Sequence, residues 1–181
     1  MKSPLNQKIL FLKVKNQDKD AFGQFYDLYV TRIYRFIFFK INSVADAQDI
    51  TSEVFLKLWQ YIREGRDIKN LNALTYMIAR NMVIDFYRQN SKIEDPISED
   101  HNNIADDQKD LLRQQIMDSE LSDVLKGIEN LKDEYKEVII LKYLDELSHS
   151  EIAEVLNKSN GSVRVLLYRA IKALKENVHD Q

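Results

Sequence analysis

The sequence contains no cysteine, and only four glycines and two prolines stand among its 181 residues. Without cysteine, the chain cannot form a disulfide framework, a cysteine-based metal site or a thiol nucleophile. The scarcity of glycine and proline argues against a turn-rich all-β protein, because the tight turns between short strands depend on these residues. It favours long, uninterrupted helices instead.

Long apolar runs are also absent from the sequence. The most apolar stretches, FIFF and VIIL, are far shorter than the roughly 18 residues that a helix needs to cross a bilayer. The apolar patch near the N-terminus gives way to charged residues after four positions, which is too short for a signal peptide. We therefore expect a cytoplasmic protein.

Residue sets that carry out catalysis or hold cofactors are missing too. The three histidines, His101, His149 and His179, are far apart in the chain and form neither a metal-ligand set nor a catalytic triad. No glycine-rich phosphate loop is present. We expect no enzymatic activity, no cofactor and no bound metal.

Apolar residues spaced three and four apart predict helices in the first half of the chain. In the second of these helices, Phe22, Phe25 and Tyr29 begin a single apolar face. The third begins at a capping box formed by Ser43 and Asp46. The predicted helices cover roughly residues 6–14, 20–40, 43–62 and 72–89.

Residues 91–110 separate this half from the next. They carry seven acidic residues against two lysines and show no apolar periodicity, so they bury too little apolar surface to offset the entropy of ordering. A surface loop within one domain is the alternative, but structureless loops beyond about 12–15 residues are uncommon in compact domains. The expected fold is all-α: two small helical domains, residues 1–90 and 111–181, joined by a flexible acidic linker.

Two helix starts lie close together near the C-terminus, at Ser148 and Ser159. The first helix must end near Asn157, a residue that tolerates the left-handed turn of a C-cap. The second helix has one apolar stripe, and its other sides are largely basic with one aromatic ring, Tyr168. This pattern describes a helix-turn-helix that inserts its second helix into the major groove. A helical hairpin with a solvated basic face fits the pattern equally well.

Three segments resemble one protein family. LSHSEIAEVLNKSNGSVRVLLYRAIKALKE resembles the C-terminal DNA-binding region of bacterial sigma factors of the sigma-70 superfamily, closest to the extracytoplasmic-function (ECF) group. DAQDITSEVFLKLWQYI resembles the family's segment that binds core RNA polymerase, and NALTYMIARNMVIDFYRQN its segment that reads the promoter minus-10 element. The resemblance covers nearly the whole chain in the family's order. Departures from the family's usual residues occur at Leu74, Met77, Glu146 and Lys158.

The resemblance implies a transcription initiation factor in which residues 1–90 correspond to sigma region 2 and residues 111–181 to region 4. Its implied partners are promoter DNA and core RNA polymerase, through the beta-prime clamp helices and the beta flap. Members of this group are usually held inactive by an anti-sigma factor, often membrane-bound, so such a partner is expected.

The resemblance also assigns residues to each surface. The residues expected to bind core polymerase are Asp46, Asp49, Ile50, Glu53 and Val54. Those expected at the minus-10 element are Tyr76, Arg80, Asn81, Asp85 and Arg88. Those expected at the minus-35 element are Asn160, Ser162, Arg164, Tyr168 and Lys172.

Other interpretations compete with these assignments. The acids of the third helix also fit a solvated face, Tyr76 also fits a core aromatic, and Asp85 also fits an ordinary surface acid. A free-standing helix-turn-helix regulator would bind duplex DNA without polymerase. A helical scaffold protein would bind neither DNA nor polymerase.

Overall fold

The computed structural model describes residues 4–41, 43–90, 128 and 130–179. Every regular element in these residues is a helix, which confirms the all-α prediction. The chain divides into two compact units, residues 1–87 with 150–158 and residues 88–149 with 159–181. The expected linker, residues 91–110, lies outside the described residues, so the domain limits stay a prediction.

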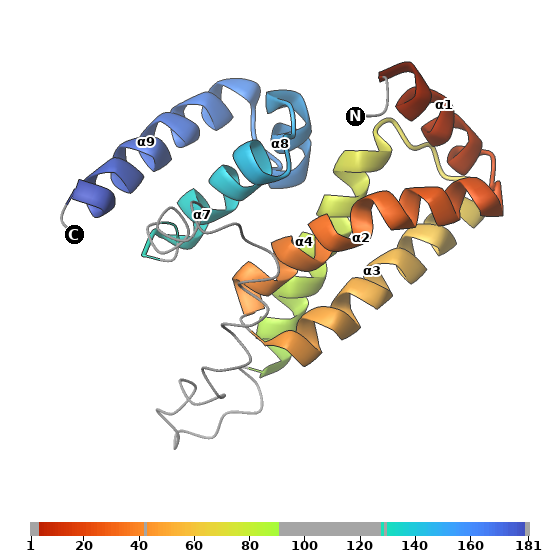
Figure 1. Cartoon of the computed structure of the whole chain (residues 1–181), viewed down its shortest axis with the longest axis horizontal. Coiled ribbons are helices and arrows are strands. Elements are labelled where there is room, and N and C mark those ends of the chain that lie inside the picture. The colour runs from red at the N-terminus through yellow and green to blue at the C-terminus, as the bar shows by residue number, and fades with distance from the viewer. Residues whose placement is uncertain (1–3, 42, 91–127, 129, 180–181) are drawn as a thin grey trace. The chain divides into compact units, whose positions relative to one another are not determined.

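The first unit contains the four helices expected in the first half of the chain. Helices α1 and α3 both pack against α2 (Figure 1). Each helix begins and ends within two residues of its predicted limits. The helices are α1 (Pro4–Lys15), α2 (Lys19–Ile41), α3 (Val44–Arg63) and α4 (Leu71–Asn90).

Side chains that accept backbone hydrogen bonds determine where three of these helices start. The Asp46 amide donates to Ser43 Oγ at 3.4 Å, at the start of α3. The Ala21 amide donates to Asp18 Oδ1 at 2.9 Å, and the Ala73 amide donates to Asn70 Oδ1 at 3.1 Å. Each bond satisfies an amide that has no partner within its own helix, which stabilises the helix start.

Aromatic rings fill much of the core between α1, α2 and α3. The Phe25 ring stacks on Tyr29 with centroids 4.4 Å apart, and Phe11 of α1 approaches Phe25 edge-on at 5.7 Å. Gln7 Nε2 donates to the Tyr29 hydroxyl at 2.8 Å. Burial raises the pKa of Tyr29, because a charged phenolate loses its hydration there.

The second unit is built on α7 (Asp133–Ile139), which packs against α9 (Asn160–His179) (Figure 1). A π-helical turn, η2 (Ile140–Leu144), continues α7 directly. The chain reverses just after this turn at Glu146, whose φ of 59° is left-handed, and the Leu147 amide donates to the Leu141 carbonyl at 2.9 Å. The π turn was not predicted from the sequence.

Helix α8 (His149–Leu156) ends in the turn that was expected at Asn157. Asn157 has a φ of 51°, its amide donates to the Glu154 carbonyl, and the Lys158 amide donates to the Ala153 carbonyl at 2.9 Å. This pair of bonds is a Schellman motif, which stops the helix and satisfies its last carbonyls. No helix in the described residues is long and apolar enough to cross a membrane.

Candidate nucleic-acid and protein interfaces

Ser159 caps the N-terminus of α9. The Ser162 amide donates to Ser159 Oγ at 3.1 Å, and the two serine hydroxyls are 2.8 Å apart. The first turn contains no acidic residue, so the positive end of the helix dipole is not neutralised by the helix's own side chains. This end of α9 therefore favours an anionic partner such as a phosphate.

The five residues of α9 that were assigned to the minus-35 element are all exposed. Tyr168 is 72% exposed, although large aromatic side chains are usually buried. Lys172 Nζ lies 3.9 Å from a Glu176 carboxylate oxygen, one turn along the helix. The exposed set is Asn160, Ser162, Arg164, Tyr168 and Lys172.

The same exposed surface of α9 contains two residues that the assignment left out. Val165 is 51% exposed and Arg169 is also exposed. The helical pattern contained the signal, because neither residue falls on the apolar stripe that contains Val163, Leu167 and Ala170. Arg169 adds a positive charge to this surface, and Val165 adds apolar area.

The residues of α4 assigned to the minus-10 element divide between surface and core. Asn81, Asp85 and Arg88 are exposed, and their spacing of four and three puts them on one face of the helix. Arg80 is half-buried at the side of this face. Met77 and Ile84 add exposed apolar surface to the same face, which the assignment did not include.

Tyr76 is a correction to the sequence-based assignment. Its side chain is fully buried and packs edge-on against Phe36 of α2, with ring centroids 5.4 Å apart. The ring has no exposed surface with which to stack on a base. We therefore treat Tyr76 as a core residue that positions α4.

The loop between α3 and α4 connects the helix assigned to core polymerase with the helix assigned to the minus-10 element. It begins with Gly65 at a φ of 67°, a conformation that glycine adopts without steric cost. Arg66 forms an ion pair with Glu64 at 2.6 Å, and its guanidinium lies 4.7 Å from the centre of the Tyr61 ring. The side chain of Ile68 is buried and anchors the far end of the loop.

Helix α3 presents two of its assigned acids to solvent. Asp49 and Glu53 are exposed and Asp46 is half-buried, so the acidic face was predicted correctly as a surface. Ile50 is 9% exposed and Val54 is fully buried, so these two residues support the helix from the core. They offer little or no surface for a partner.

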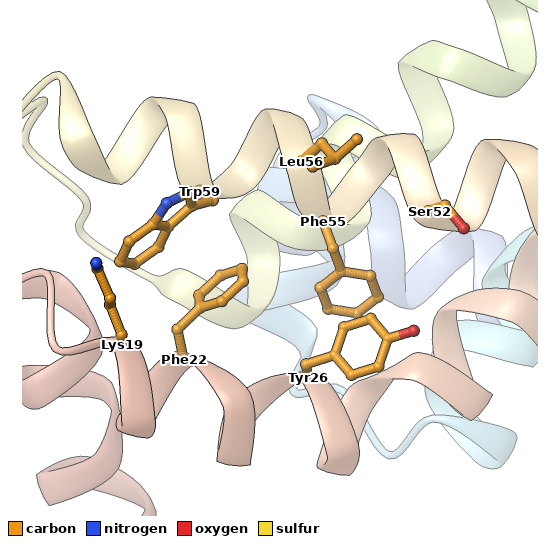
Figure 2. Close-up of a pocket in the computed structure, with 7 residues that line it drawn as sticks. All are labelled: Lys19, Phe22, Tyr26, Ser52, Phe55, Leu56 and Trp59. Carbon is orange, nitrogen blue, oxygen red and sulfur yellow. The ribbon is translucent and has the colours of Figure 1, made fainter.

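An apolar groove of approximately 480 Å³ lies between α2 and α3 (Figure 2). Two contacts between rings of α2 and α3 line it: Phe22 with Trp59 in a tilted arrangement, and Tyr26 with Phe55 edge-on, each with centroids 4.7 Å apart. Leu56, which is 62% exposed, lies on the rim. Lys19 and Ser52 complete the lining.

Leu56 and Ser52 connect this groove to the acids of α3. Residues 49, 52, 53 and 56 are three or four positions apart and share one face of the helix. An exposed strip that combines acidic and apolar side chains suits docking of a basic protein segment. Among the described residues, no group of histidine, aspartate and glutamate side chains is arranged to hold a metal ion.

Comparisons with known proteins match both halves of the chain to one family. Residues 25–93 match the family profile described as Sigma-70 region 2, and residues 121–174 match the one described as Sigma-70, region 4. The solved structure of the sigma factor RpoE from Bartonella quintana, in complex with the anti-sigma factor NepR, has a similar fold. Its TM-score is 0.64 at 19% identity, over 87% of this chain and 96% of that one.

Two relatives extend the match to nearly the full sequence. The ECF RNA polymerase sigma factor BldN of Streptomyces coelicolor is 31% identical over 90% of this chain, which spans 62% of the length of BldN. The ECF RNA polymerase sigma factor SigW of Bacillus subtilis is 30% identical over 93% of this chain and 94% of its own length. The chain therefore belongs to the ECF group of sigma-70 family RNA polymerase sigma factors.

Proposed function

We propose that this sigma factor binds core RNA polymerase in the cytoplasm and uses α4 at the promoter minus-10 element and α9 at the minus-35 element. Residues 1–90 act as region 2, residues 111–181 as region 4, and residues 91–110 connect them. The observation that supports this proposal best is the pair of exposed polar faces on α4 and α9. They lie within the segments that match regions 2 and 4.

At the minus-10 element, the exposed face of α4 holds bases that have left the duplex. The Asn81 side chain both donates and accepts hydrogen bonds, which suits the edge of an unpaired base. Arg88 attracts the phosphate backbone, and Met77 and Ile84 offer apolar surface to an unstacked base. Asp85 contacts a base edge or an arginine side chain, because a DNA phosphate would repel its carboxylate.

At the minus-35 element, α9 binds in the major groove of the closed duplex. Its N-terminal end attracts a phosphate and thereby sets the register of the helix before bases are read. Arg164 then makes a bidentate contact with guanine or holds a phosphate. Lys172 lies farther from the N-terminus of the helix and binds the phosphate backbone.

Core polymerase docks on the strip of α3 that contains Asp49, Ser52, Glu53 and Leu56. The acids attract a basic segment such as the beta-prime clamp helices, and Leu56 with the adjacent groove provides the apolar contact. The beta flap is the expected partner of region 4. Bartonella quintana RpoE was solved with an anti-sigma factor, and we propose that a protein of this class, often membrane-bound, restrains this chain too.

The core-binding surface is tested by reversing its charge. The double variant Asp49→Lys/Glu53→Lys should bind core polymerase roughly tenfold more weakly or worse, because like charges now face the basic partner. Its helicity should not change, since both side chains are exposed. The measurement is a titration of labelled full-length protein with core polymerase.

Asp20→Lys/Asp27→Lys is the matched control, because it changes the net charge equally at two exposed positions of α2. It should bind core polymerase like the unmodified protein. Unchanged binding by the α3 variant would exclude this face of α3 as the docking surface. Equal losses in both variants would indicate a general charge effect and exclude a specific contact.

A further inference from the structure

Two large apolar side chains on α9 have no place in the core of the protein. Val165 is 51% exposed and Tyr168 is 72% exposed. The side of α9 that packs on the core is already filled by other residues. These are Val163, Leu166, Leu167 and Ala170.

The spacing of residues along α9 puts both side chains on the line farthest from the core. Gly161, Val165, Tyr168 and Lys172 follow one another at intervals of four, three and four, which is one line along a helix. At about 100° per residue, Arg164 lies to one side of this line and Arg169 to the other. The exposed surface is therefore an apolar line between two arginines.

This arrangement matches the geometry of a helix in the major groove. The line farthest from the core faces the base edges, and the two sides of the helix face the phosphate backbones. The arginines are then directed toward phosphates. The apolar residues are directed toward bases.

Gly161 shows that α9 can approach a partner closely. A Cβ atom added at this residue would meet only Ser159 Oγ, at 3.8 Å, which is ordinary van der Waals contact. The fold therefore does not require glycine here, although glycine weakens a helix relative to alanine. The absence of a side chain lets the backbone of the first turn come near a surface, and Val165 lies one turn farther along.

We propose that Val165 recognises a thymine by packing against its 5-methyl group. The proposal rests on the proposed binding of α9 to minus-35 DNA. Thymine is the base that presents a methyl group in the major groove, whereas cytosine presents an amino group at the neighbouring position. Valine carries two methyl groups and no polar atom, so it favours the methyl group and leaves the amino donor of cytosine unsatisfied.

The test removes a single methyl group from the DNA. Full-length protein assembled with core polymerase selects its preferred sequence from duplexes randomised across the minus-35 region. Each thymine of that sequence is then replaced singly by deoxyuridine, which lacks only the methyl group. We expect one position at which this replacement weakens binding about three- to fourfold. Burial of one methyl-sized group changes a binding constant by about this factor.

Two variants assign that effect to Val165. In Val165→Ser the sensitivity to deoxyuridine at this position should disappear, because the hydroxyl gives no matching apolar contact. In Val165→Ile the sensitivity should remain. Both substitutions are on an exposed surface, and circular dichroism checks that α9 still forms.

The outcomes separate this proposal from the function on which it rests. If the assembled polymerase selects a clear sequence but no thymine in it is sensitive, methyl recognition is excluded while the function of α9 stands. Sensitivity that persists in Val165→Ser excludes Val165 as the residue responsible. If no minus-35 sequence is selected at all, the proposed function of α9 fails and the role of Val165 fails with it.

Discussion

Single residues with left-handed backbone end several helices of this protein. Gln17, Glu146 and Asn157 have φ values of 64°, 59° and 51°. Asparagine tolerates this conformation well, whereas a residue such as glutamate is strained by about 1–3 kcal/mol. At Gln17, the side-chain amide compensates in part by donating to the Ile62 carbonyl at 3.4 Å. A glycine in place of Glu146 would remove the backbone strain at this turn.

Glu146→Gly should raise the free energy of unfolding by about 1 kcal/mol, because glycine adopts a positive φ without steric cost. Urea denaturation monitored by circular dichroism measures this change. Asn157→Gly is the control and should change stability less, since asparagine already suits its turn. A less stable Glu146→Gly would mean that contacts of the Glu146 side chain outweigh the backbone strain.

At the scale of the element, α9 depends on a cap that also lies at the proposed DNA surface. Ser159 Oγ accepts the Ser162 amide at 3.1 Å, and Ser159 itself is exposed. The residue at position 159 must therefore cap the helix and also allow a DNA phosphate to approach. An aspartate would satisfy the helix start, but its charge would repel a phosphate.

Ser159→Ala should lower the free energy of unfolding by about 1 kcal/mol, because a helix amide loses its acceptor. Ser159→Asp should restore that stability, yet its affinity for duplex DNA should fall and the loss should be larger at low salt. Thermal denaturation and fluorescence anisotropy on the full-length protein measure the two effects. If Ser159→Asp binds DNA as well as the unmodified protein does, the N-terminus of α9 is not close to phosphate.

The helices were predictable because their signals are local. Ser43 and Asp46 predicted the start of α3, and Asn157 predicted the end of α8, from residues adjacent in sequence. The burial of Tyr76 was not predictable in this way, because its neighbour Phe36 is on another helix. The burial of Val54, by contrast, follows from the apolar stripe that it forms with Ile50 and Leu58 at intervals of four residues. The periodic pattern predicts which side of a helix faces the core. Whether an aromatic or polar residue beside that side is also buried depends on the neighbouring helix, which the pattern does not identify.

The π turn η2 also lacked a signal in the sequence. It adds one residue to the last turn of a helix without changing the composition of Ile140–Leu144, which reads as ordinary apolar helix. The surfaces proposed to bind partners were also only partly predictable from the sequence. The helical pattern placed Val165 and Tyr168 off the apolar stripe of α9, but their exposed fractions and the groove between α2 and α3 came only from the structure.

At the scale of the whole molecule, the core of the first unit contains ionisable groups. Tyr29 is 3% exposed within the aromatic cluster, and burial raises its pKa above 10.0, an effect that its bond to Gln7 and the nearby Arg32 partly oppose. Burial also raises the pKa of Tyr34 on the same helix. The folded state therefore holds these phenolic protons more tightly than the unfolded chain does.

This difference predicts an alkaline limit to stability. Because the folded pKa of Tyr29 exceeds the unfolded value of 10.0, its contribution is complete below about pH 10 and is lost as the pH rises toward the folded pKa. Tyr29→Phe should be less stable near neutral pH by about 1 kcal/mol, since the hydrogen bond from Gln7 is lost. Its stability should nevertheless decline less steeply above pH 10 than that of the unmodified protein. Urea midpoints from pH 8 to about 11 test this, and lysine titration is common to both proteins. Parallel declines would show that Tyr29 ionises in the folded state as readily as in the unfolded chain.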